Sequence, residues 1–494
     1  MKVVSQPPIA HTLISATRHI GYSLEAAVAD LIDNSIAADA RKIEIVFEDN
    51  TSNQYISIID DGCGMSALEI TKAMRYGSAD PSKKRDSKDL GRYGLGLKTA
   101  SMSQCRRLTV VSKKAGVLSA RRWDLDYILK HKDLVWPLLE LDDNEFESLP
   151  GVDRLAKWKS GTVVIWQCID FGGAYNEKSF DDEMFMMKEH LALVFHRYLA
   201  GEDGIDKIEI KVNGSELAPK DPFLQYAKEG KLGHQCKATQ ILGSEPNRII
   251  LHAYTLPHDN ELTAATRSAL GVNGKTLKKS QGFYIYRNKR LITYGSWCGL
   301  KAQGEFFKLS RVQVDIPNTL DSQWSLDVKK SIAVPPKHIM DGLRMYVNSV
   351  VSQSKNAIRV QVLGKNTKKK SDDPQVWETK VKDNEVTAVL LNREHPIIKA
   401  ALDANVISEK LLCLFERTIP VDVIYYSRCS EQKMENEQPL SVDEMVGMLS
   451  SLIQMVPMGK ARKEAFRSMI LCEPFALKAA ELKAREEEII NATH

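Results

Sequence analysis

The segment ISIIDDGCGM at residues 56–65 constrains the fold of this chain more than any other. An apolar, β-rich run predicts a strand, and this strand ends in two aspartates followed by a pair of glycines. Glycine adopts backbone conformations that other residues avoid, so the chain can turn sharply and a flat ligand can approach its backbone. Asp60 can accept a hydrogen bond from an exocyclic amine such as that of adenine. The alternative is an ordinary tight turn, since Asp-Gly is a common turn pair.

Residues 23–38, SLEAAVADLIDNSIAA, predict a helix that begins after Ser23 as its N-cap. Apolar side chains recur at helical spacing, which predicts burial on one side. Asp30 and Asn34 are four residues apart and therefore share a face, with Asp33 beside them. An amide oxygen suits Mg²⁺, and a nearby carboxylate can orient a water for in-line attack. The alternative is a solvated polar helix face, which is an ordinary feature.

Three glycines in GRYGLGLKTAS, residues 91–101, precede a helix expected to start near Leu97. Backbone amides of such a loop and the positive end of a helix suit phosphate groups. The spacing is that of neither a P-loop nor a dinucleotide-binding fingerprint. The polar stretch before it, residues 75–90, is typical of a mobile lid or of an ordinary surface loop. The candidate phosphate-binding residues are Gly91, Gly94, Gly96, Lys98 and Thr99.

The chain has 494 residues, 43% of them hydrophobic and 27% charged, which predicts a globular protein of two to four domains. No apolar run is long enough to span a bilayer, and no secretion signal is evident at the start. The eight cysteines form no C-x-x-C pair, which argues against zinc fingers and a disulfide framework. We therefore expect a cytoplasmic protein with no membrane partner. The net charge of +4 neither requires nor excludes nucleic acid.

Short β-rich runs alternate with helical patterns along the first 172 residues, at 43–47, 56–60, 108–112 and 162–166. A polar stretch at 173–187 predicts a crossing into a second mixed unit, with strands near 206–212, 283–287 and 311–316. In the run FYIYRNKR the side chains alternate as in a strand, so half of them should be buried. A long helix is predicted at 337–361, then a solvated linker at 365–374, and a mostly helical stretch at 375–494.

Four segments of the first 166 residues resemble, in order and spacing, the motifs of the GHKL ATPases. They are DLIDN (30–34), DDGCGM (60–65), GRYGLGLKTAS (91–101) and GTVVIW (161–166). The superfamily includes gyrase, the ninety-kilodalton heat-shock chaperones, histidine kinases, the mismatch-repair protein MutL and the MORC proteins. The likeness is strongest to MORC-type and related bacterial ATPases, which have a similar glycine-rich stretch.

The resemblance implies an α/β (α+β) architecture that opens with the Bergerat ATP-binding sandwich. It implies a GHKL ATPase domain at 1–175 and a transducer domain of ribosomal S5-type fold at 176–336. A helix and charged linker at 337–374 and a mostly α-helical C-terminal domain at 375–494 would follow.

By the same resemblance, Asn34 coordinates Mg²⁺, Asp60 reads the adenine amino group and Thr162 supports Asp60 and the adenine through a water. The remaining implied ATP-binding residues are Gly62, Gly64 and Met65 at the adenine, and Gly91, Gly94, Gly96, Lys98 and Thr99 at the phosphates.

Asp30 departs from the family pattern, because hydrolysing members usually have Glu there to orient the attacking water. Asp is one methylene shorter, and a displacement of about 1 Å can lower a rate by about 100-fold. Either the helix lies closer to the phosphate, or a further water bridges the gap, or hydrolysis is slow. Asp30 remains the expected general base.

Residues 282–336 resemble the transducer domain, which in these families sends a basic residue to the γ-phosphate. Lys329 or Lys330 of DVKKS lies in the matching region, and an ammonium there would stabilise the transferring charge. The alternative is a basic surface turn. Trp297 and Trp324 are expected in a core or between domains rather than at the ligand.

Only about 20 residues precede the Asp30 helix, too few for the phosphoacceptor domain of a histidine kinase. The first hypothesis is therefore an ATPase that uses Mg²⁺ and ATP to close a nucleotide-gated clamp by dimerisation, with DNA as one candidate partner, as in MORC-like relatives. The basic residues at 365–370 and 83–85 fit DNA or solvated loops about equally. The second hypothesis is a nucleotide-dependent interaction or chaperone-like module with little turnover, in which the C-terminal region binds a protein partner.

Overall fold

The structure is a computed structural model. It describes residues 8–18, 22–49, 54–77, 96–170, 179–202, 204–225, 235–244, 247–257, 262–270, 277–321, 323–324, 335–359, 376–382, 385–403, 408–418, 440–472 and 475–491. The chain forms two compact units, Met1–Val351 and Ser352–His494, and each is described by itself.

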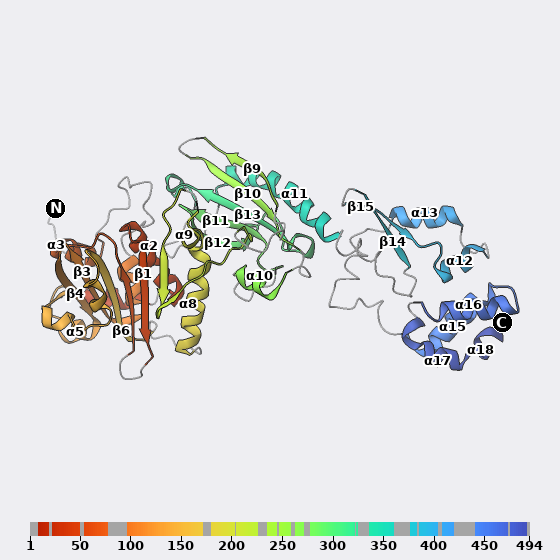
Figure 1. Cartoon of the computed structure of the whole chain (residues 1–494), viewed down its shortest axis with the longest axis horizontal. Helices are drawn as coiled ribbons and strands as arrows, with labels where there is room; N and C mark the ends of the chain where they lie inside the picture. The colour runs from red at the N-terminus through yellow and green to blue at the C-terminus, as the bar shows by residue number, and fades with distance from the viewer. Residues whose placement is uncertain are drawn as a thin grey trace, which may run out of the picture. The chain divides into compact units, whose positions relative to one another are not determined.

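Within the described residues, the first sheet of the N-terminal unit has eight strands in the order β5-β4-β3-β6-β2-β1-β7-β8. Figure 1 labels β1, β3, β4 and β6 of this sheet. Neighbouring strands are antiparallel, except that β1 and β7 are parallel. The four strands predicted in the first 172 residues are all present. The strands are β1 (Lys42–Glu48), β2 (Tyr55–Asp60), β3 (Cys105–Lys114), β4 (Val117–Asp124), β5 (Leu139–Leu141), β6 (Gly161–Ile169), β7 (Glu209–Val212) and β8 (Ser215–Glu216).

Both faces of this sheet are covered, which explains why its central strand reads as a continuous apolar run. In β6, Val164 and Trp166 join the larger core under one layer of helices, while Val163 and Ile165 join a smaller core on the opposite face. The larger layer contains α1 (Ala10–Arg18), α2 (Leu24–Ala37), α3 (Ala67–Met74), α4 (Gly96–Met102), α5 (Leu125–Lys130), α8 (Phe180–Val194) and α9 (His196–Ala200). The smaller core is closed by α6 (Asp143–Phe146) and α7 (Val152–Leu155).

Residues 180–212 belong with this first sheet, which corrects the predicted crossing into a new unit at 173–187. Helices α8 and α9 supply apolar side chains to the larger core. Strand β7, predicted as part of the second unit, pairs in parallel with β1, from Lys42 opposite Glu209 to Ile45 opposite Val212. The sequence shows strand character here, but the partner of a strand depends on tertiary packing. The other predicted domain boundaries stay predictions.

A second sheet, with order β12-β11-β13-β10-β9, follows in the same unit. Its central pair, β11 and β13, is parallel, and its other neighbours are antiparallel. The elements are β9 (Gln235–Leu242), β10 (Ile249–Thr255), α10 (Ala264–Ala269), β11 (Gly282–Arg287), β12 (Arg290–Ser296), η3 (Glu305–Phe307), β13 (Ser310–Ile316), η4 (Asn318–Leu320) and α11 (Lys337–Arg359).

Strand β11 is buried on both faces, so burial extends beyond the half of its side chains for which it was predicted. Phe283 and Ile285 pack in a core with α11, Trp297 and Trp324. Tyr284 and Tyr286 pack on the other side in a cluster that includes Phe223 and Leu193, the latter from α8. Helix α8, which also packs on the first sheet, therefore contributes to the burial of this second face.

The C-terminal unit is mostly helical, as predicted, but it opens with a hairpin that the sequence analysis missed. Strands β14 (Trp377–Lys382) and β15 (Glu385–Leu391) pair antiparallel on either side of Asp-Asn, a turn-forming pair that could have revealed them. The helices are α12 (Pro396–Asp403), α13 (Glu409–Thr418), α15 (Val442–Gln454), α16 (Lys460–Met469), η8 (Phe475–Lys478), α17 (Ala479–Ala484) and α18 (Glu486–Asn491).

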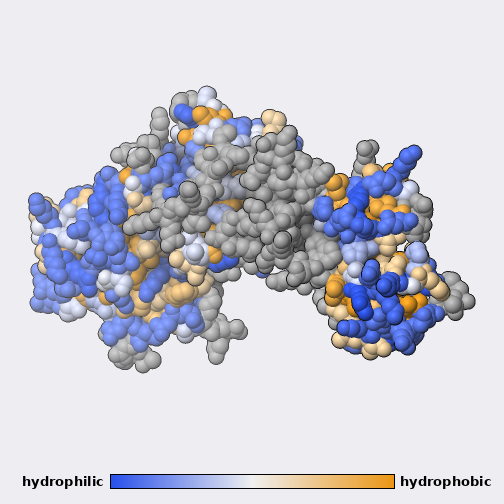
Figure 2. Space-filling model, turned by 45° about the vertical axis from the view of Figure 1, so that its right-hand side comes forward, coloured by the Kyte–Doolittle hydropathy of each residue, from blue (hydrophilic) through white to orange (hydrophobic). Residues whose placement is uncertain are grey.

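The surface of the C-terminal unit carries hydrophobic residues beside hydrophilic ones on the face seen in Figure 2. Its own core joins α15, α16, α17 and α18 around Leu449, Phe466 and Ile489. Across the described part of the chain, no helix is both long and apolar enough to cross a membrane.

Candidate functional site

Asp60 lies at the last position of β2 and is almost completely buried. One carboxylate oxygen, Oδ1, accepts the backbone N–H of Gly62 at 3.0 Å, and Oδ2 accepts the hydroxyl of Ser35 at 3.0 Å. Burial raises the pKa of Asp60 to about 6, against the opposing effect of these hydrogen bonds. The strand end therefore holds a carboxylate in fixed orientation, ionised at neutral pH and surrounded by protein.

Two hydroxyls lie beside this carboxylate on the adjacent strands. Thr162 of β6 pairs directly with Asp60 across the sheet, and Ser112 of β3 pairs with Thr162. The Oγ atoms of Ser112 and Thr162 are 2.9 Å apart. Ser112 also donates to the carbonyl of Gly161 at 3.0 Å and accepts the N–H of Met65 at 2.8 Å. Sequence reasoning missed Ser112, whose only signal was a hydroxyl in the buried run LTVVS.

The loop after Asp60 approaches other backbone so closely that it requires glycine. At Gly64, with φ of 67°, a Cβ atom would lie 2.0 Å from the carbonyl oxygen of Lys113. At Gly62 a Cβ would lie 2.8 Å from the carbonyl oxygen of Ala38, and Cys63 N–H donates to that carbonyl. These glycines thus pack the loop against β3 and against the end of α2.

Helix α2 follows Ser23 as predicted, although the Ser23 side chain makes no capping hydrogen bond. The alternative of a solvated polar face is wrong for Asp30 and Asp33, which are 4% and 1% exposed. Asn34, four residues after Asp30, is exposed. Asp30 Oδ2 accepts the hydroxyl of Tyr22 at 3.2 Å. The helix thus presents a buried carboxylate and an accessible amide one turn apart.

Helix α4 begins at Gly96, the last glycine of the glycine-rich segment, and lies against α2. A Cβ atom at Gly96 would be 3.5 Å from Asp30 Oδ2, so this backbone passes directly over the carboxylate. Lys98 and Thr99 are buried, and Lys98 Nζ donates to the carbonyl of Ala73 at 2.9 Å. Burial lowers the pKa of Lys98 to about 8. The Lys98 ammonium therefore lies against the last turn of α3.

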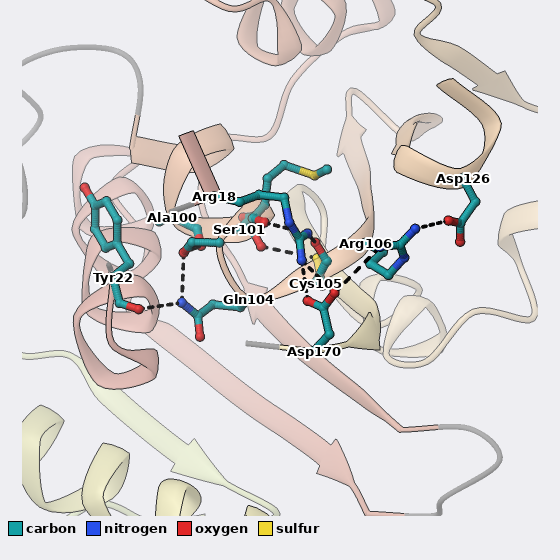
Figure 3. A network of polar contacts seen from close by, with 11 residues as sticks. Arg18, Tyr22, Ala100, Ser101, Gln104, Cys105, Arg106, Asp126 and Asp170 are labelled. Carbon is teal, nitrogen blue, oxygen red and sulfur yellow. Dashed lines mark hydrogen bonds and ion pairs between the residues drawn. The ribbon is translucent and has the colours of Figure 1, made fainter. Parts of the chain in front are cut away.

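Arg18, a buried arginine of α1, contacts the end of α4 and the start of β3 (Figure 3). Arg18 Nη1 donates to the carbonyls of Met102 and Cys105 at 2.9 and 2.6 Å, and its Nη2 contacts both oxygens of Asp170 at 2.5 and 2.6 Å. Gln104 Nε2 donates to the carbonyl of Tyr22 at 3.1 Å, in the same network. No sequence pattern pointed to Arg18, because its partners lie more than 80 residues away.

The structure brings Asp60, Gly62, Gly64, Met65 and Thr162 together at the ends of β2 and β6. It also places Gly96 of α4 next to Asp30 of α2. Asn34 is exposed on α2, Thr99 is buried in α4, and Lys98 of α4 contacts the carbonyl of Ala73. Gly91, Gly94, Lys329, Lys330 and most of the predicted lid at 75–90 lie outside the described residues.

The family described as "Histidine kinase-, DNA gyrase B-, and HSP90-like ATPase" matches residues 22–162, the range that contains the site residues from Asp30 to Thr162. These residues are a GHKL ATPase domain. The predicted superfamily, its MORC-like character and the mixed α+β fold class are confirmed.

Several relatives of the GHKL ATPase domain carry MORC or MutL names. "ATPase morc-1" of Caenorhabditis elegans is 34% identical over 120 residues, which are 24% of this chain and 14% of that protein. "ATPase MORC2B" of Mus musculus is 32% identical over 241 residues, 47% of this chain and 23% of that protein. "DNA mismatch repair protein MutL" of Chlorobaculum tepidum is 32% identical over 93 residues, 18% of this chain and 15% of that protein. The chain therefore spans less than a quarter of the length of each of these relatives.

Proposed function

We propose that this protein binds ATP with Mg²⁺ and hydrolyses it slowly. Asp60 carries this proposal. Its buried, ionised carboxylate is held by Gly62 and Ser35 on neighbouring segments, as required for a fixed acceptor of the adenine amino group. Thr162 and Ser112 extend this polar edge with hydroxyls that can hold a bridging water. Gly62, Gly64 and Met65 form the wall of the same pocket.

Helix α2 would hold the metal and orient the attacking water. Asn34 is exposed and offers the neutral oxygen that Mg²⁺ accepts as a ligand. When bound, Mg²⁺ neutralises charge on the phosphates. Asp30 acts as the general base. It is buried next to Gly96, so the glycine-rich backbone that would hold the phosphates lies close to its carboxylate. This short separation would compensate for a side chain one methylene shorter than Glu. Gly91, Gly94, Gly96, Lys98 and Thr99 bind the phosphates.

The second sheet completes the site as a transducer domain. Lys329 or Lys330 would approach the γ-phosphate and stabilise the charge that develops during transfer. ATP would order the lid at 75–90 and join two ATPase domains, and hydrolysis would release them. The similarity to MORC and MutL proteins supports such a nucleotide-gated dimer, and the similarity to a DNA mismatch repair protein supports DNA as its partner.

A steady-state ATPase assay with Asp30→Asn and Asn34→Ala tests the enzymatic function. Both variants should lose at least about 10-fold in kcat, because each removes a group that acts on the transferring phosphoryl. Asp39→Asn is the matched control: Asp39 is exposed just beyond α2 and has φ of 59°, which Asn adopts readily. Equal turnover by wild type and both variants would refute hydrolysis and leave the second candidate, a nucleotide-dependent interaction module whose C-terminal region binds a protein partner.

The clamp is tested by solution mass with ADP, ATP and a non-hydrolysable ATP analogue. A dimer should form with the analogue and dissociate with ADP, and a mass unchanged in all three states would refute nucleotide gating. DNA as partner predicts binding that weakens steeply with salt and responds to the analogue. Binding that is absent or insensitive to salt would remove DNA from the proposal.

A further inference from the structure

The turn between β11 and β12 concentrates positive charge at one point of the second sheet. Its sequence is Arg287-Asn288-Lys289-Arg290, and the two central residues have positive φ, 46° and 66°, as in a two-residue hairpin turn. Arg287 and Arg290 are therefore directly opposite each other across the strands. Like charges in this position destabilise a hairpin, so the turn needs carboxylates from elsewhere.

Each arginine of this turn has a carboxylate from a different part of the molecule. Arg287 donates through Nε and Nη2 to the two oxygens of Asp321, at 2.7 and 2.6 Å. Arg290 Nε lies 3.2 Å from Asp33 Oδ2 and 3.4 Å from Asp33 Oδ1. The Arg290 and Asp33 side chains are only 4% and 1% exposed, and the guanidinium lies 5.8 Å from the centre of the Phe195 ring. The ion pair is thus sealed from solvent.

The two carboxylates come from different segments, one of which belongs to the proposed ATP site. Asp33 immediately precedes Asn34 and lies one turn after Asp30 on α2. Asp321 directly follows η4, and the chain beyond it contains Lys329 and Lys330. One hairpin turn of the second sheet therefore forms ion pairs with the helix that would hold Mg²⁺ and with the residue that follows η4.

We propose that Arg290 is a positioning residue of the ATPase reaction, which sets Asp30 and Asn34 through its ion pair with Asp33. This role rests on the proposed function. A buried carboxylate on a rigid helix keeps its orientation only while its counter-charge stays in place. A shift of the second sheet would therefore move α2, and small displacements of reacting groups change rates strongly. The ion pair thereby links the state of the second sheet to the geometry of the site.

Arg197 provides a matched control at the same interface. It is also buried, and Nη1 contacts Asp315 of β13 at 2.5 Å while Nε and Nη2 contact Glu202. None of the partners shown for Arg197 belongs to α2. An Arg197→Met variant removes a buried interdomain charge without touching the helix of the site.

The experiment compares Arg290→Met, Arg290→Lys, Arg197→Met and the double variant Asp33→Leu/Arg290→Met in the full-length protein. We expect Arg290→Met to lower kcat for ATP about 10- to 100-fold while the Kd for ATP without Mg²⁺ changes less than about twofold. Arg290→Lys should recover part of the kcat. Arg197→Met should lower Tm as much as Arg290→Met does but keep kcat within about threefold of wild type.

The double variant addresses folding, because it leaves no unpaired buried charge. It should unfold near the wild-type Tm and still show the low kcat. Wild-type kcat in Arg290→Met or in the folded double variant would overturn the inference, as would an equal loss in Arg197→Met.

If the wild-type protein binds ATP without turnover, the hydrolysis proposal fails but the positioning role is still measured. The readout is then the gain in ATP affinity on adding Mg²⁺, which should fall at least about fivefold in Arg290→Met and remain in Arg197→Met. An unchanged gain in Arg290→Met would overturn the inference. Absence of ATP binding by wild type would refute both proposals.

Discussion

Replacing Asp60 by Asn should make the protein more stable and a poorer ATP binder at the same time. The substitution keeps the shape of the side chain. Its amide oxygen can accept the N–H of Gly62, and its NH₂ can donate to Ser35 Oγ, which lies 3.2 Å from the carbonyl of Leu31 and can donate there. What changes is the charge, which burial makes unfavourable.

The magnitude follows from the pKa of Asp60, which is about 6 in the folded protein against an ordinary value of 3.8. Because the folded pKa is raised, the folded state binds more protons than the unfolded state between about pH 4 and 6. The ionised carboxylate therefore lowers the free energy of unfolding as pH rises through this window, by about 3 kcal/mol in total. Asp60→Asn should regain much of this at pH 7.5.

Denaturant unfolding of wild type and Asp60→Asn at several pH values between 4 and 8 measures this difference. The variant should be more stable at pH 7.5, and the gap should narrow toward pH 4, where Asp60 is protonated in the folded state and only partly ionised in the unfolded state. Its ATP affinity should fall at least about 10-fold, since a charge-assisted hydrogen bond is lost. Wild-type affinity should weaken below about pH 6, while the variant shows no such step. A variant less stable than wild type across this range would refute the reasoning.

Two further predictions concern packing around the site. Gly64→Ala should destabilise the protein by several kcal/mol in a denaturant titration, because its Cβ would lie 2.0 Å from the Lys113 carbonyl oxygen. Gly116 also has a positive φ but no atom within 4 Å of an added Cβ, so Gly116→Ala should lose only about 1 kcal/mol. Arg18→Met should lower the free energy of unfolding by about 2 to 3 kcal/mol, because two carbonyls and a partly exposed carboxylate lose their buried hydrogen-bond donor. Arg41 forms an exposed ion pair, so Arg41→Met should change it by less than about 1 kcal/mol. Similar losses within either pair of variants would contradict these accounts.

Local patterns predicted the elements that carry the site. The run ISIID became β2, and the helical spacing after Ser23 became α2, because strand and helix periodicity are properties of neighbouring residues. The sequence patterns did not show that β7 pairs with the first sheet or that β11 is buried on both faces, for a different reason. Strand partners and the coverage of a sheet face depend on segments far away in the chain, which periodicity does not report.

The order of the acidic and glycine-bearing motifs was enough to predict the ATPase superfamily of residues 22–162. Each motif is a short run of adjacent residues at a helix or at the end of a strand, so it is visible in the sequence. Only the tertiary structure decided what surrounds those motifs. In the folded chain Asp33, for which a solvated helix face was one interpretation, is buried against Arg290, which lies 257 residues further along the sequence. The fold also places Ser112 beside Thr162. Such contacts arise where two sheets and their helices pack together, and the free energy that fixes them comes from burial across the whole unit.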